Sequence, residues 1–191
     1  MLILGKTLYH KPVMSLQTGR QIAKTVRPII NPADLQIVGH TLADIRSNDG
    51  EMYLLTQDIR EMSSMGFIVD SVDELLREED AIKLQDLLKL QFELAGMKVV
   101  DTQKKMLGKV TDYSFEPTTF LIQQLHVKPS FLQGIKTSRL LIHRKQIVEI
   151  SNTHIVVEQA HIKNKASYSR DVFVNPFRQP SSPDIATTDN R

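Results

Sequence analysis

Residues 58–70 read DIREMSSMGFIVD and residues 146–158 read QIVEISNTHIVVE, so one stretch of this chain occurs twice. Four residues recur at matching places in the two copies, as Ile59/Ile147, Glu61/Glu149, Ser63/Ser151 and Val69/Val157. A second echo, whose spacing is shorter by three residues, pairs Ile22-Ala23-Lys24 with Leu107-Gly108-Lys109 and Asn31-Pro32 with Glu116-Pro117. Both echoes keep the same order along the chain. This repeat predicts two related β modules in tandem, the second carrying three extra residues.

The chain length of 191 residues suits two modules of roughly 80 to 90 residues each. Modules of that size bury a modest core, so we expect each module to be stabilised by packing against the other module or against a shared helix. We assign residues 1–70 to the first module, 71–93 to a helical linker, 94–165 to the second module and 166–191 to a disordered tail. The tail assignment depends on its polar composition, which includes Pro176, Pro180 and Pro183.

Short stretches rich in β-branched and aromatic residues predict strands in both modules. In the first module these include Ile22–Ile30, where Pro28 predicts a sheet edge or a bulge, then Leu35–Ile45 and Phe67–Val69. In the second module they are Met97–Val100, Met106–Phe115, Phe120–Lys128, Leu140–Ile142, Ile147–Ile150 and Ile155–Val157. Asn31–Asp34 and Ser47–Gly50 have the composition of tight turns. Strands this short favour small closed barrels, because closure removes exposed sheet edges.

The period of the apolar residues changes at the linker. Ser71 and Glu74 have the spacing of a helix capping box. Two apolar stripes follow, out of phase with each other: Val72, Leu75 and Leu76, then Leu84, Leu87 and Leu88. We expect one broken helix or two short helices between Val72 and Gln91, packed through their leucines. A plain structural connector is one interpretation, and a docking helix for a partner is the other.

The composition is that of an ordinary soluble protein, with 41% hydrophobic and 24% charged residues. No stretch approaches the roughly 20 apolar residues of a membrane span, and Met1–Leu4 is too short for the apolar core of a signal peptide. The absence of cysteine excludes disulfides, thiolate metal sites and a cysteine nucleophile. We therefore expect a cytoplasmic protein.

The net charge of +2 conceals a difference between the two halves of the sequence. Residues 1–95 contain 10 Lys+Arg and 14 Asp+Glu, for a net charge of −4, whereas residues 96–191 contain 14 and 8, for a net charge of +6. Such a chain can steer an anionic partner to its second module, or it can align with copies of itself.

Three motifs of the second module resemble a known family. They are Gly96-Met97-Lys98-Val99-Val100-Asp101, then Lys104-Lys105-Met106-Leu107-Gly108-Lys109-Val110, and Gln146-Ile147-Val148-Glu149-Ile150. Together they resemble the PRC-barrel pattern, in which a G-x-x-V-V-D strand precedes a G-K-x-x-G-K-V hairpin and an I-x-E-I strand. The first module is a weaker match, with Ala23 where the pattern has glycine. The resemblance spans about residues 8–160 and implies two small PRC-type barrels in tandem, joined by the short Leu-rich linker.

The functions that this resemblance implies are binding functions. PRC barrels occur in a ribosome maturation factor, in the photosynthetic reaction centre H subunit and in archaeal cell-division adaptors. We therefore expect a noncatalytic adaptor that engages a protein or ribonucleoprotein partner, with RNA contact as one form of that binding. The alternative is a self-assembling or membrane-peripheral scaffold, in which the acidic first module of one copy meets the basic second module of another. An unrecognised enzyme is a remote third possibility, and we nominate no catalytic, cofactor-binding or metal-binding residue.

One cluster of charge is a candidate partner-binding face. It comprises Lys104, Lys105, Lys109, Lys136, Arg139, Arg144 and Lys145, with Lys163 and Lys165 beyond them. If the hairpin and the loop before Leu140 share one end of the barrel, these charges converge on a surface for RNA phosphates or an acidic protein. The competing interpretation is a set of solvated lysines at strand ends, because few aromatic residues lie among them.

The six histidines show no spacing typical of a metal site. His40 and His126 fall in matching strands one register step apart, which places them on opposite faces. We interpret the histidines as surface or edge residues.

Overall fold

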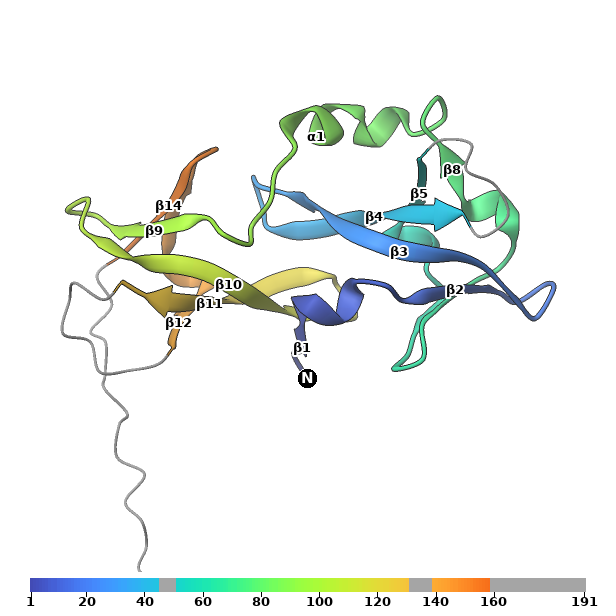
Figure 1. The fold of residues 1–191 in the computed structure, drawn as a ribbon, viewed down its shortest axis with the longest axis horizontal. Helices are drawn as coiled ribbons and strands as arrows, with labels where there is room; N and C mark the ends of the chain where they lie inside the picture. Colours follow the sequence, from blue (N-terminus) through green and yellow to red (C-terminus); the bar gives the residue numbers. More distant parts are fainter. Residues whose placement is uncertain (45–50, 131–138, 159–191) are drawn as a thin grey trace, which may run out of the picture.

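The computed structural model describes residues 1–44, 51–130 and 139–158. These residues form a mainly β protein whose strands belong to one mixed sheet (Figure 1). The expected tail, the Ser47–Gly50 turn, and Lys136, Lys163 and Lys165 lie outside the described residues.

The first half of the molecule contains strands that recur in the second half in the same order. Its elements are β2 (Pro12–Ser15), β3 (Arg20–Asn31), β4 (Gln36–Asp44), β5 (Met52–Leu55), the 3-10 turn η2 (Thr56–Asp58), β6 (Glu61–Met62) and β7 (Phe67–Val69). Those of the second half are β9 (Lys98–Asp101), β10 (Met106–Glu116), β11 (Leu121–Pro129), β12 (Leu140–His143), η6 (Arg144–Gln146), β13 (Ile147–Ile150) and β14 (His154–Val157). The strands predicted in the second module are confirmed to within one residue at each end.

The strand pairings repeat as well. The sheet runs β13-β14-β9-β10-β11-β4-β3-β2-β7-β6, so the second half reads as the mirror order of the first. Each half has one parallel pair, β2 with β7 and β9 with β14, among antiparallel neighbours. The connection between the third and fourth strands of the repeat spans residues 45–51 in the first half and 130–139 in the second. The three extra residues of the second copy therefore belong to this connection.

The repeated residues occupy equivalent places. Ile59 and Ile147 each follow a 3-10 turn and donate a backbone hydrogen bond to its first residue. Glu61 pairs with Ile68 as Glu149 pairs with Val156. The identity between Ser63 and Ser151 has a structural reason. Each hydroxyl accepts backbone N–H groups in the turn that follows. The duplication read from the sequence is therefore also a duplication of backbone structure.

The two halves meet at the tips of their long hairpins. Leu35 and Phe120 hold matching positions there, both with positive φ, at 57° and 55°. The Ile37 N–H donates to the Phe120 carbonyl at 2.9 Å, and the Ile122 N–H donates to the Leu35 carbonyl at 3.0 Å. This exchange joins β4 to β11 and makes one sheet from the two copies. The N-terminal strand β1 (Ile3–Leu4) adds a second link, because it pairs with β10 of the second half.

The main hydrophobic core is shared by both halves. It includes Val13, Ile37, Leu54 and Phe67 from the first half and Val99, Phe115, Ile122, Leu125 and Ile155 from the second. Phe115 and Phe120 stack with ring centroids 5.9 Å apart beside the junction. The expectation that each module is stabilised by packing against the other agrees with this continuous core.

The linker is less helical than its sequence suggests. The structure has a 3-10 turn η3 (Val72–Glu74), a strand β8 (Leu76–Arg77) paired with β5, a 3-10 turn η4 (Ile82–Leu84) and one short helix α1 (Gln85–Leu90). The first predicted helix is therefore wrong. Leu75 enters the main core while Leu76 packs with a second cluster, and such alternation belongs to extended chain rather than to a helix. Ser71 does cap a turn, but it accepts from Asp73 N–H rather than forming a box with Glu74.

The second leucine stripe packs as predicted, on the first half only. Ala81 and Leu84 are buried with Ile29 and Tyr53, while Leu87 and Leu88 pack beside them. In Figure 1, α1 lies above β3 and β4. In the second half the residue equivalent to Tyr53 is Leu141, and its side chain is 56% exposed. Among the described residues, no helix is long and apolar enough to cross a bilayer.

One backbone position in β3 tests a prediction, and one in β10 has a close backbone neighbour. The ladder between β3 and β4 shifts register between Thr25 and Arg27, so the bulge predicted from Pro28 is present, although β3 is not an edge strand. Gly108 lies close against β11, because an added Cβ would strike the backbone carbonyl of Lys128. The equivalent residue of the first half, Ala23, carries a Cβ and is fully buried.

Candidate functional site

The predicted basic residues that the structure describes fall into three groups rather than one. Lys104 and Lys105 lie at the β9–β10 turn, Lys109 and Arg139 lie on or beside the strands β10 and β12, and Arg144 and Lys145 lie in η6. The proposed role of these residues in binding stays a prediction.

The first group is held by a buried carboxylate. Asp101 Oδ1 accepts the N–H groups of Gln103 and Lys105 at 2.9 and 2.8 Å, and Lys104 adopts a φ of 64°. The matching turn of the first half uses Ser15 and Gly19, where Ser15 Oγ accepts the Thr18 N–H at 3.3 Å. Both lysine side chains are therefore displayed at the tip of a fixed turn.

The third group faces the junction between the halves. Arg144 Nη2 donates to the Asp34 carbonyl at 3.1 Å, which ties η6 to the β3–β4 turn of the first half. A shallow, polar depression of about 230 Å³ lies between Pro32–Leu35 and Ile147–Ile150. Arg144 thus has a structural contact, and it is separated in the fold from the hairpin lysines.

The histidine interpretation is wrong for His40. Its side chain is fully buried, with ring centroids 4.9 Å from Phe67 and 6.4 Å from Phe120. Neither ring nitrogen has a hydrogen-bond partner among the described residues. Burial lowers the pKa of His40 to about 3, so the ring is neutral at pH 7. The equivalent residue of the second half is Leu125, also fully buried, while His126 faces the other way and bonds Ser114 Oγ at 2.7 Å.

Two other histidines have partners that are typical of structural residues. His143 Nδ1 accepts the Lys145 N–H at 3.2 Å, and Gln146 closes a capping box on the His143 N–H at 2.8 Å. His154 Nδ1 lies 3.0 Å from the hydroxyls of Ser151 and Thr153. Within residues 1–44, 51–130 and 139–158, no carboxylate bonds either ring and no group of three potential metal ligands forms.

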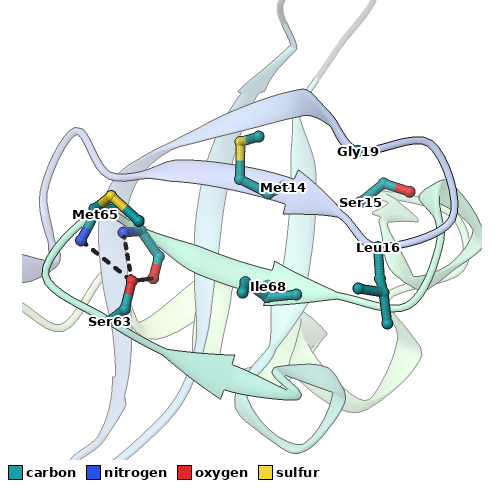
Figure 2. Close-up of a pocket in the computed structure, with 8 residues that line it drawn as sticks. Met14, Ser15, Leu16, Gly19, Ser63, Met65 and Ile68 are labelled. Atoms are coloured by element: carbon teal, nitrogen blue, oxygen red, sulfur yellow. Dashed lines mark hydrogen bonds between the residues drawn. The ribbon is translucent and has the colours of Figure 1, made fainter.

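A groove that the sequence did not reveal lies at the outer end of the first half (Figure 2). It lies between the β2–β3 hairpin and the β6–β7 turn and has a volume of about 280 Å³. Its lining is chiefly apolar and consists of Met14, Ser15, Leu16, Gly19, Ser63, Met65, Gly66 and Ile68. Met14 and Ile68 sit side by side on the parallel strands β2 and β7. Leu16 is 56% exposed and Met65 is 81% exposed.

The wall of the groove is fixed by one serine. Ser63 Oγ accepts the N–H groups of Met65 and Gly66 at 3.2 and 3.3 Å, shown as dashed lines in Figure 2. Lys11 Nζ donates to the Ser64 carbonyl at 2.6 Å at one end of β2, and Arg20 follows Gly19 at the other. Lys11 and Arg20 therefore flank the strand β2, which forms one side of the groove.

The second half provides an internal comparison for this surface. The equivalents of Met14 and Ile68 are Val100 and Val156, which remain apolar. Leu16 and Met65, in contrast, correspond to Thr102 and Thr153. Because the same backbone accepts threonine at both places, the fold does not require the exposed leucine and methionine.

Comparison with known proteins adds no family to this description, since no family model matches the chain and no curated protein shows significant similarity to it.

Proposed function

We propose that this protein is a noncatalytic adaptor made of two PRC-type barrels and that its first half docks a partner protein. The PRC assignment is supported by the three motifs of the second module and by the repetition of strand order, turns and register between the halves. The binding proposal is carried by one observation. Exposed apolar residues line the groove of the first half where the second half has threonines.

The energetics of the groove favour an occupant. Burying a leucine or methionine side chain contributes roughly 1.5–3 kcal/mol, so Leu16 and Met65 together offer a sizeable gain on docking. Small-molecule sites usually enclose most of their ligand and contain convergent polar groups. This groove is open, and its Ser63 hydroxyl is already engaged by two backbone N–H groups. A protein surface is therefore the better-matched ligand.

The charges around the groove narrow the kind of partner. Lys11 and Arg20 flank the strand β2 on one side of it, and Glu61, which pairs with Ile68, lies along its β6 side. Arg60 and Asp70 neutralise each other at 2.7 Å. These charges suit a segment that presents two or three apolar side chains with acidic residues at its ends.

The test replaces the groove residues by those of the second half. Leu16→Thr together with Met65→Thr should leave the free energy of unfolding within about 0.5 kcal/mol of the unaltered protein, because both sites are exposed. The matched control is Leu141→Thr with Val148→Thr, which removes two side chains that are 56% and 57% exposed in the second half.

The readout is site-specific crosslinking in a lysate of the source organism. A benzoylphenylalanine at position 65 should crosslink to a protein segment with apolar side chains and flanking acids, and purified partner should then bind the control variant but not the groove variant. Equal binding by the groove variant would refute the groove as the docking site. Crosslinking to a second copy of this chain would instead favour the self-assembling scaffold.

A further inference from the structure

A row of cations crosses the second half from strand to strand. Lys109 on β10 is directly opposite Lys98 on β9 and directly opposite Lys128 on β11. Arg139 immediately precedes β12, and the β11–β12 register, continued by one residue, places it opposite Lys128. Residues directly opposite in neighbouring strands point to the same face. We call Lys98, Lys109, Lys128 and Arg139 the cation row.

The cation row is a cost to the fold. Neighbouring strands lie about 4.8 Å apart, and like charges directly opposite each other are destabilising. The three lysines and Arg139 are exposed, and within the described part of the chain none of them forms an ion pair. Fold stability therefore does not explain why these four cations lie in a row.

The first half shows that the fold does not demand these charges. The equivalents of Lys98, Lys109 and Lys128 are Pro12, Lys24 and Ala43, which are likewise paired across β2, β3 and β4. One cation thus stands where the second half has three. The excess positive charge of the second half, read from its composition, is in part placed in a line on one face.

The groups beside the row identify the ligand chemistry. His154 pairs with Lys98 on the far side, and two residues along β11 from Lys128, beside the bulged Thr111, His126 pairs with Asp112 and with Leu141. Imidazole and hydroxyl groups, like lysine, bind phosphate oxygens. The row itself contains no large apolar side chain, although Leu141 beside it is 56% exposed. A protein interface typically has an apolar centre. A line of point charges spaced by strands matches a linear polyanion better than a compact anion.

We infer that the cation row binds the phosphodiester backbone of a nucleic acid, without reading its sequence. The absence of aromatic side chains from the row leaves no platform for stacked bases. The surface lies on the opposite half of the repeat from the groove, and it does not depend on the docking proposal. Only Lys109 and Arg139 belong to the basic face expected from the sequence; Lys98 and Lys128 are additions from the strand register.

The experiment measures binding of a fluorescein-labelled 20-nucleotide oligo(U) by anisotropy between 50 and 200 mM NaCl. For single strands, log Kobs changes by about −0.7 per phosphate contact for each unit of log salt concentration. Lys98→Ala with Lys128→Ala should therefore make the slope shallower by about 1.4 and weaken binding by about 25-fold at 0.1 M salt. This row variant should fold at least as well as the unaltered protein, because a repulsion is removed.

Two controls separate the row from general charge. Lys6→Ala with Lys24→Ala removes the same charge from outside the row and should change binding several-fold less. Lys104→Ala with Lys105→Ala removes two charges from the hairpin tip, and it should likewise change binding several-fold less than the row variant. Equal losses in the row variant and the Lys6/Lys24 variant would overturn the inference, as would an unaltered protein that does not bind oligo(U).

Two further measurements distinguish between the kinds of anionic ligand. An unlabelled DNA duplex that displaces labelled oligo(U) supports the shared backbone chemistry and shows that the ribose is not read. A labelled 20-residue polyglutamate that binds as tightly as oligo(U), with the same loss in the row variant, would overturn the inference in favour of an acidic protein. Groove variants leave all of these measurements unchanged, so failure here is distinct from failure of the docking proposal.

Discussion

Replacing His40 by leucine should stabilise the protein, and the gain should grow as the pH falls. The ring is fully buried against Phe67, and both of its nitrogens lack hydrogen-bond partners among the described residues. A buried unsatisfied polar group costs about 1–3 kcal/mol, so His40→Leu should raise the free energy of unfolding by about that amount at pH 8. Leucine fits the position, since Leu125 holds the same place in the second half.

The pH dependence follows from proton binding. An unfolded histidine has a pKa of about 6.5, whereas burial lowers the pKa of His40 in the folded state to about 3. Between these values the unfolded chain binds a proton that the folded chain does not, so acidification favours unfolding. At pH 5 this linkage destabilises the unaltered protein by about 2 kcal/mol relative to pH 8, and the loss continues to about pH 3. The leucine variant lacks this contribution.

Urea denaturation at pH 8, 7, 6 and 5 measures the effect. The difference in free energy of unfolding between His40→Leu and the unaltered protein should widen by about 2 kcal/mol over that range. Ile37→Val is the control, because it alters the same strand in the buried core without changing a titrating group. A difference for His40→Leu as flat with pH as that for Ile37→Val would refute the burial of a neutral, unpartnered imidazole.

Two further substitutions test the packing. Gly108→Ala should destabilise by about 2 kcal/mol and lower the melting temperature by about 4–8 °C, because the new Cβ meets the rigid Lys128 carbonyl; the control Ala23→Gly should cost about 0.5–1 kcal/mol, and equal losses at the two sites would contradict the clash. Leu84→Ala should cost about 2–5 kcal/mol and speed hydrogen exchange in α1, since Leu84 directly precedes that helix and is 2% exposed against Ile29 and Tyr53; unchanged exchange there would show that the helix does not depend on this contact.

The repeat made much of the fold predictable from sequence. Matching residues such as Ser63 and Ser151 recur because the same turn needs the same hydroxyl acceptor, so identities between the copies report local backbone structure. Strand positions followed from β-branched content in both halves. The linker was harder, because Leu75 and Leu76 have helical spacing with their neighbours yet face different cores, and only tertiary packing decides between these arrangements.

The full sets of residues that form the candidate surfaces could not be predicted from the sequence, for a geometric reason. Lys98, Lys109 and Lys128 are far apart in the chain, and their alignment depends on register shifts in β10, between Met106 and Gly108 and between Val110 and Asp112. A shift of one residue would have turned a lysine to the other face. The groove likewise needs the β2–β3 hairpin and the β6–β7 turn brought together by a parallel pair. His40 was misjudged because burial of an unpaired histidine runs against its polarity.

Both surfaces arise where the two copies differ, and this predicts that they act independently. The groove and the cation row share no residue or hydrogen bond, and substitutions at sites without shared partners usually combine additively. A variant with Leu16→Thr, Met65→Thr, Lys98→Ala and Lys128→Ala should lose binding of the partner protein as fully as the groove variant and binding of oligo(U) as fully as the row variant.

Titrating oligo(U) in the presence and absence of saturating partner protein measures the coupling between the two surfaces directly. An adaptor with two separate surfaces gives the same oligo(U) affinity in both titrations, whereas a change of more than about fivefold would show a coupling free energy of 1 kcal/mol or more and would mean that the two halves communicate through their shared core.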